Sequence, residues 1–82
     1  MARIQRVPTD SLHVNPNTRI ASVPRSLDAL LRSEGMNQPL IVSEDTGEII
    51  DGVQRWHAAK RIGMLEVPVI KVPVHGQAPA PD

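Results

Sequence analysis

Residues 48–63, EIIDGVQRWHAAKRIG, combine a short apolar run, a glycine and a helical pattern that ends at a second glycine. At helical spacing, one arc of this helix collects the apolar side chains of Trp56, Ala58, Ala59 and Ile62. Arg55 falls inside that arc. Because a guanidinium keeps its charge and is rarely buried without a partner, we expect an anionic group near the start of this helix.

The segments on either side extend the pattern to a small α/β domain. We predict two helices, four strands, a loop and a hairpin turn: helices at 24–34 and 52–62, strands at 3–7, 40–43, 48–50 and 67–72, the loop at 10–19 and the turn at 44–47. Gly35 and Gly63 suit the ends of the two helices. The order β-α-β-β-α-β predicts a small mixed sheet with two principal helices packed on it.

Two apolar faces supply the predicted core. Leu27, Leu30 and Leu31 form a narrow stripe on the first helix. We expect this stripe and the apolar arc of the second helix to be buried against strand valines and isoleucines, with each fully buried leucine contributing about 2 kcal/mol before entropy is subtracted. Trp56, the single aromatic residue, is expected in the core rather than on a base-stacking surface.

The length and composition limit the chain to a few classes of protein. The 82 residues have room for one domain, predicted at 1–72, followed by a Pro-rich flexible tail at 73–82. The chain has no cysteine, which excludes a thiol nucleophile, a disulfide and a thiolate metal site. It has neither an apolar signal core nor an apolar run long enough to span a membrane, so we expect a cytoplasmic protein without a membrane partner.

The charge balance argues against strong unaided binding to nucleic acid. Nine Lys and Arg residues match nine Asp and Glu residues. Proteins that bind DNA by themselves usually carry a basic excess that neutralises phosphates. The three histidines, His13, His57 and His75, have no metal-ligand spacing, and we expect them in solvent.

The junction between the third strand and the second helix is a candidate phosphate site. The amides of Gly52, Val53 and Gln54 precede the first intrahelical hydrogen bonds, and the helix dipole favours an anion there. Arg55 is one turn inside the helix and can bend back to donate two hydrogen bonds to a phosphate. Asp51 would repel that phosphate, and a bound Mg²⁺ reconciles the two charges.

A purely structural interpretation of the same residues stays open. Asp51 is a favoured helix N-cap residue, and Gly52 suits a tight turn. Arg55 then pairs with Asp51 or with an acid on another element. Short glycine motifs occur often by chance, so the residues alone do not decide between a ligand site and a structural junction.

Two stretches resemble the ParB/sulfiredoxin superfamily, and specifically the ParB-like N-terminal domain that is often called a nuclease domain. Residues 33–42, SEGMNQPLIV, are similar to the family's helix end, glycine and Q-P strand. Residues 49–72, IIDGVQRWHAAKRIGMLEVPVIKV, are similar to its G-E-R-R box, Ala-rich helix and closing V-P-V strand. The segment from Asn15-Pro16 to Arg19 is similar to the family's N-P-x-x-x-R segment.

The resemblance implies a site for a nucleoside triphosphate, CTP or ATP, with Mg²⁺. It places the phosphates at Gly52 and Arg55, adds Arg19, and lines the same pocket with Gly35, Gln38 and Pro39. Val53 stands where sulfiredoxin carries its catalytic cysteine, so that sulfur chemistry is excluded. Val53 and Gln54 also replace the Glu and Arg of the ParB box. Asp51 resembles the D-G-x-x-R form of the superfamily's free-serine kinases, in which the aspartate serves metal and phosphate chemistry.

Three functions follow from these residues. The first is a stand-alone nucleotide-binding module with a regulatory role or a role in DNA transactions. Its candidate partners are a protein through which it reaches DNA and a second copy of the chain in a homodimer. The second is a small Mg²⁺-dependent phosphotransferase or nuclease that uses Asp51 as its catalytic and metal-binding residue. The third is a protein-interaction module with a vestigial pocket, in which His57 and Arg61 lie on the partner surface.

Overall fold

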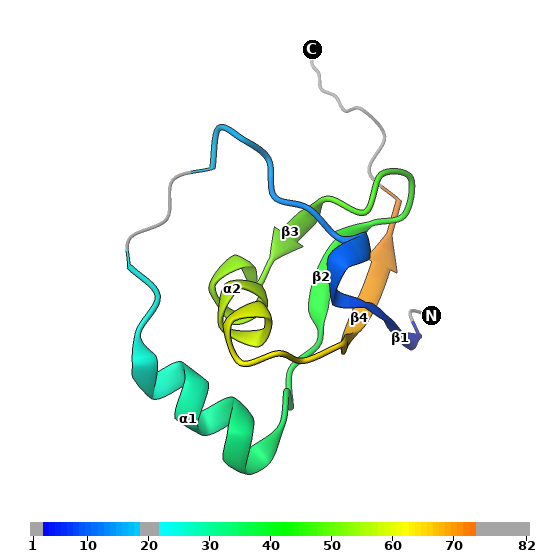
Figure 1. Ribbon diagram of the computed structural model, residues 1–82. Coiled ribbons are helices and arrows are strands. Elements are labelled where there is room, and N and C mark those ends of the chain that lie inside the picture. Colours follow the sequence, from blue (N-terminus) through cyan, green and yellow to red (C-terminus); the bar gives the residue numbers. More distant parts are fainter. Residues whose placement is uncertain (1–2, 19–21, 74–82) are drawn as a thin grey trace.

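The computed structural model describes residues 3–18 and 22–73 and forms a four-stranded sheet with two principal helices (Figure 1). The elements are β1 Ile4–Pro8, the 3-10 helix η1 Thr9–Ser11, α1 Arg25–Glu34, β2 Leu40–Ser43, β3 Ile49–Asp51, α2 Val53–Arg61 and β4 Glu66–Val72. This arrangement confirms the predicted mixed α/β fold and the order β-α-β-β-α-β. The 3-10 helix η1 begins one residue before the segment predicted as a loop and covers its first two residues.

The sheet has the strand order β1-β4-β2-β3, so the first and last strands of the domain are neighbours. β1 pairs antiparallel with β4, and β2 pairs antiparallel with β3 across an irregularity at Ile41/Val42. The central pair, β4 and β2, is parallel. Parallel neighbours need a crossover connection, and here the crossover carries both β3 and α2. The β3–α2 junction therefore lies within the connection between the two central strands, while β3 itself is an edge strand.

The core lies between α2 and one face of the sheet. Its most deeply buried side chains come from β2 and β4: Leu40, Val42, Val67 and Val69. Ala58 and Ala59 of α2 are fully buried against them, and Trp56 is 7% exposed, as the sequence predicts. The Trp56 indole donates a hydrogen bond to the Thr9 carbonyl at 3.0 Å, which joins α2 to η1.

The predicted burial of the whole α1 stripe is wrong for one residue. Leu31 is buried and Leu27 is half-buried, but Leu30 is 47% exposed. α1 packs mainly against α2 rather than against the sheet, and it stands to one side of the sheet in Figure 1. A helix that rests on another helix along a narrow strip buries few positions, so Leu30 remains at the surface.

A partly buried ion pair joins the start of α1 to the end of α2. Asp28 is 4% exposed, and both of its carboxylate oxygens accept hydrogen bonds from Arg61, from Nε at 2.8 Å and from Nη2 at 2.6 Å. The hydrogen bond from Arg61 lowers the pKa of the Asp28 carboxyl below its ordinary value of 3.8, although burial acts in the opposite direction. Arg61, which the interaction-module hypothesis places on a partner surface, therefore makes hydrogen bonds within the fold.

Two further features that concern the chain as a whole are membrane-spanning helices and the C-terminal tail. Within residues 3–18 and 22–73, no helix is long and apolar enough to cross a membrane. The predicted tail at 73–82 and His75 lie outside the described residues, except for Pro73.

Candidate functional site

The β3–α2 junction is formed by a glycine in the left-handed region. Gly52 is the N-cap residue of α2, with φ 99° and ψ 21°, and no side chain caps the helix. The first hydrogen bond of the helix runs from the Trp56 amide to the Gly52 carbonyl at 3.0 Å. The interpretation of Asp51 as the N-cap is therefore wrong, because the left-handed turn gives that position to Gly52. The amides of Val53, Gln54 and Arg55 precede the first intrahelical bond and remain available to an anion.

The glycine also makes room for the arginine side chain. A Cβ atom at position 52 would lie 2.6 Å from Leu40 Cδ2 and 2.7 Å from Arg55 Nη2. Both distances are shorter than van der Waals contact permits. The Arg55 guanidinium therefore lies directly over the backbone of the junction, as the sequence predicts for a side chain that bends back toward the helix start.

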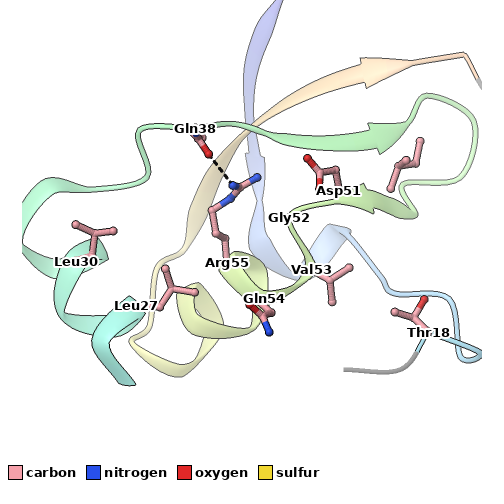
Figure 2. A pocket seen from close by; sticks show the side chains of 10 residues that line it. Thr18, Leu27, Leu30, Gln38, Asp51, Gly52, Val53, Gln54 and Arg55 are labelled. Carbon is pink, nitrogen blue, oxygen red and sulfur yellow. Dashed lines mark hydrogen bonds between the residues drawn. The ribbon is translucent and has the colours of Figure 1, made fainter. Parts of the chain in front are cut away.

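Arg55 is held by neutral partners in the described part of the chain. Nη1 donates to Gln38 Oε1 at 2.9 Å, and Nη2 is 3.5 Å from the Pro39 carbonyl oxygen (Figure 2). Nε is buried and has no hydrogen-bond partner among residues 3–18 and 22–73. The ion pairs of those residues do not include Arg55, so the proposed structural pairing with Asp51 is absent there. A half-buried guanidinium without a counter-ion is a favourable place for an anion.

A pocket of about 580 Å³ opens in front of this arginine. Six predicted residues line it: Gln38, Asp51, Gly52, Val53, Gln54 and Arg55. Gly35 lines a second hollow of about 310 Å³, which shares Gln38 and Arg55 with the first. Pro39 contributes its carbonyl to Arg55. Arg19 lies outside the described residues, but its neighbour Thr18 lines the first pocket.

Sequence reasoning did not find the apolar wall of this pocket. Leu27 and Leu30 of α1 line it on the far side of Arg55 from Asp51 (Figure 2). Ile50 of β3 also lines the pocket. Leu30 and Ile50 are about half exposed, at 47% and 49%. The helical stripe of leucines was the available signal, but it fits a core as well as a pocket wall. Which of its residues face the pocket depends on how α1 rests on α2.

The described residues offer limited means of holding a metal ion. Among residues 3–18 and 22–73, no group of three or more His, Asp or Glu side chains is placed to hold a cation. Asp51 is exposed at the rim of the pocket and supplies a single carboxylate. A magnesium ion at this rim would take its remaining ligands from phosphate oxygens and water, as this ion commonly does.

The comparison with known proteins agrees with this fold. A sequence model of the ParB N-terminal domain matches residues 1–78. The chain belongs to the ParB N-terminal domain family. A probable plasmid-partitioning protein ParB from Deinococcus radiodurans is 50% identical over 46 residues, which cover 54% of this chain and 16% of that protein.

The structure is similar to solved structures of longer ParB proteins and of sulfiredoxin. ParB from Caulobacter crescentus complexed with CTP-γ-S aligns with a TM-score of 0.75 and 27% identity, over 88% of this chain and 45% of that one. The same protein complexed with the centromeric parS site aligns with a TM-score of 0.70 and 28% identity, over 84% and 40%. Sulfiredoxin from Arabidopsis thaliana has a TM-score of 0.72 at 17% identity, over 87% of this chain and 85% of that one, a likeness of fold alone.

Proposed function

We propose that this ParB N-terminal domain binds a nucleoside triphosphate, with its phosphates at the start of α2. The observation that carries the proposal is Arg55, whose guanidinium lies over Gly52 with a buried, unpartnered Nε and no acidic partner among the described residues. CTP is the first candidate, because the similar Caulobacter crescentus ParB was solved with CTP-γ-S. ATP is the second.

The pocket has a polar end and an apolar wall, which suits the two halves of a nucleotide. At the polar end, the amides of Val53, Gln54 and Arg55 and the Arg55 guanidinium provide donors for phosphate oxygens. Leu27, Leu30 and Ile50 also line the pocket and offer apolar surface to the base and ribose. Gln38 lines both hollows, Gly35 lines the second one, and the Pro39 carbonyl contacts Arg55. From the family resemblance, Arg19 is proposed as a second phosphate ligand.

A divalent cation is part of the proposal. Among the described lining residues, Arg55 carries the positive charge and Asp51 carries a negative one, so the pocket itself does not neutralise a triphosphate. Val53 and Gln54 add no charge where the ParB box has Glu and Arg. Mg²⁺ held between Asp51 and the phosphates would supply the missing positive charge. We therefore expect weak binding without Mg²⁺ and tighter binding with it.

Binding is favoured over catalysis by the same residues. Two-metal hydrolysis uses several carboxylates, whereas the described pocket lining offers Asp51 alone. Because the chain has a net charge of zero, we propose that any contact with DNA comes through a partner protein or a second copy of the chain. The chain covers 16% of the Deinococcus relative, so the partitioning activity of the longer protein is not assigned to it.

The proposal is tested by an NMR titration of the labelled chain with CTP, ATP, GTP and UTP, each with and without Mg²⁺. Saturable shifts are expected at the amides of Val53, Gln54 and Arg55, stronger with Mg²⁺ and lost in Arg55→Ala. Arg32→Ala is the matched control, because it removes an exposed arginine from α1 outside the pocket lining. Flat spectra at millimolar nucleotide would overturn the proposal and favour the interaction module with a vestigial pocket.

A further inference from the structure

We propose that Asp28 and Arg61 act as positioning residues that fix the apolar wall of the pocket. This inference rests on the proposed function, because it concerns the part of the pocket that would receive the base and ribose. Neither residue lines the pocket. Their effect is exerted through α1, which carries Leu27 and Leu30.

The pair ties α1 and the residues before it to α2. In addition to its two bonds with Asp28, Arg61 Nη2 donates to the carbonyl oxygens of Val23 at 3.1 Å and Pro24 at 3.3 Å. Pro24 is the N-cap of α1, so one guanidinium holds both the entry to the helix and its first turn. The planar fork of arginine suits such a bidentate contact, which lysine cannot reproduce.

Few other contacts hold α1 in place. The helix packs mainly against α2, and Leu31 is its single buried apolar side chain. Leu27 is half-buried, while Leu30 is exposed. A helix with so little buried apolar surface depends on specific polar contacts for its position.

The opposite side of the pocket is anchored independently. α2 is fixed to the sheet and to η1 by Ala58, Ala59 and Trp56, and Gly52 is fixed by the strand before it. Loss of the ion pair should therefore move the wall that carries Leu27 and Leu30 while the phosphate-binding start of α2 stays in place. The expected result is selective: weaker contact with the base and ribose and unchanged contact with the phosphates.

The test compares CTP with inorganic tripolyphosphate, each with Mg²⁺, on the wild-type chain and on Asp28→Asn and Arg61→Lys. We expect CTP affinity to fall roughly fivefold, corresponding to about 1 kcal/mol, while tripolyphosphate affinity changes less than about twofold. Asp28→Asn raises the net charge by one, which by itself favours an anion, so weaker CTP binding cannot be a general charge effect. Arg32→Gln, which removes an exposed charge from the same helix, should leave the ratio of the two affinities unchanged.

Folding is checked by the dispersion of the amide spectrum, and Arg61→Lys serves as the second variant because it keeps the charge. Unchanged CTP affinity in a folded variant overturns the inference. An equal loss for both ligands also overturns it, because that result shows a general loss of the folded state rather than a displaced wall. A wild-type chain that binds tripolyphosphate and CTP equally well shows that the apolar wall takes no part in binding, and the inference fails while the phosphate site stands. A wild-type chain that binds neither ligand overturns the proposed function itself.

Discussion

The two ends of α2 each carry an arginine whose partners are of different kinds. At the end of the helix, both oxygens of the buried Asp28 carboxylate accept hydrogen bonds from Arg61. At the start, Arg55 contacts an amide oxygen and a backbone carbonyl, and its Nε is unpartnered within residues 3–18 and 22–73. An arginine with a carboxylate partner stabilises the fold, whereas one without a counter-ion keeps its charge for a ligand. The difference in partners supports a structural role for Arg61 and the binding role that we propose for Arg55.

The most damaging change to the binding end of α2 should be Gly52→Ala. The new methyl group would collide with Leu40 and the Arg55 guanidinium, and alanine is strained at φ 99°. We expect the free energy of unfolding to fall by about 2 to 4 kcal/mol and nucleotide binding to be lost. Urea unfolding and a CTP titration measure the two effects.

Gly63→Ala is the matched control for that change. Gly63 also has a positive φ of 83°, but a Cβ there would meet no atom within 4 Å. Its cost should be limited to about 1 kcal/mol of backbone strain, with binding retained. If the two alanine variants behaved alike, the close approach of Arg55 to Gly52 would have no functional meaning.

Arg55→Ala and Arg61→Ala should differ in the property that each changes most. Removing the Arg55 guanidinium is expected to weaken nucleotide binding roughly 10- to 100-fold, as for the loss of charge-assisted hydrogen bonds, with little change in the free energy of unfolding. Arg61→Ala leaves the Asp28 carboxylate buried without its partner and should lower the free energy of unfolding. Calorimetric titration measures the nucleotide affinity of each variant, and thermal unfolding measures the stability of each. A stability loss in Arg55→Ala as large as that in Arg61→Ala would contradict the division of roles.

The structural end should also show a distinct pH dependence. Because the folded state lowers the pKa of Asp28, its carboxylate stabilises the fold above the ordinary pKa of 3.8. This contribution is lost as the pH falls below 3.8 and through the folded-state pKa. The difference in free energy of unfolding between the wild type and Asp28→Asn should therefore be largest near neutral pH and should shrink in acid. A difference that stayed constant down to pH 2, measured by urea unfolding, would show that the charge of Asp28 is unimportant.

The smallest effect is expected at the exposed wall of the pocket. Leu30→Ser changes a side chain that is 47% exposed, so the free energy of unfolding should change by less than about 0.5 kcal/mol. CTP binding should nevertheless weaken by roughly threefold, because apolar surface facing the ligand is lost. Leu65→Ser is the control, since Leu65 is 85% exposed and does not line this pocket. Equal CTP affinities in the two variants would remove Leu30 from the site.

The sequence predicts the helices and strands better than the contacts of the two arginines of α2, and the reason is physical. The positions of the helices and strands follow local patterns of apolar residues, glycines and prolines, so the sequence predicts them closely. Arg55 was found because it breaks the apolar pattern of its own helix. Its neutral contacts with Gln38 and Pro39, and the contact of Arg61 with Asp28, join residues distant in sequence, and no local pattern encodes them. Leu30 could not be placed for the same reason, since its exposure depends on how two helices cross.

The pairing of β1 with β4 has a consequence for how the chain folds during synthesis. Ile4 lies opposite Ile70, so the first strand finds its neighbour only at the end of the domain. The parallel pairing of β2 with β4 likewise waits for that last strand. Such distant pairings slow folding, because a long loop must close before they form. On the ribosome, the sheet cannot be completed until β4 has emerged, so a chain arrested before β4 would hold the arginine and glycine of the pocket without the sheet that positions them.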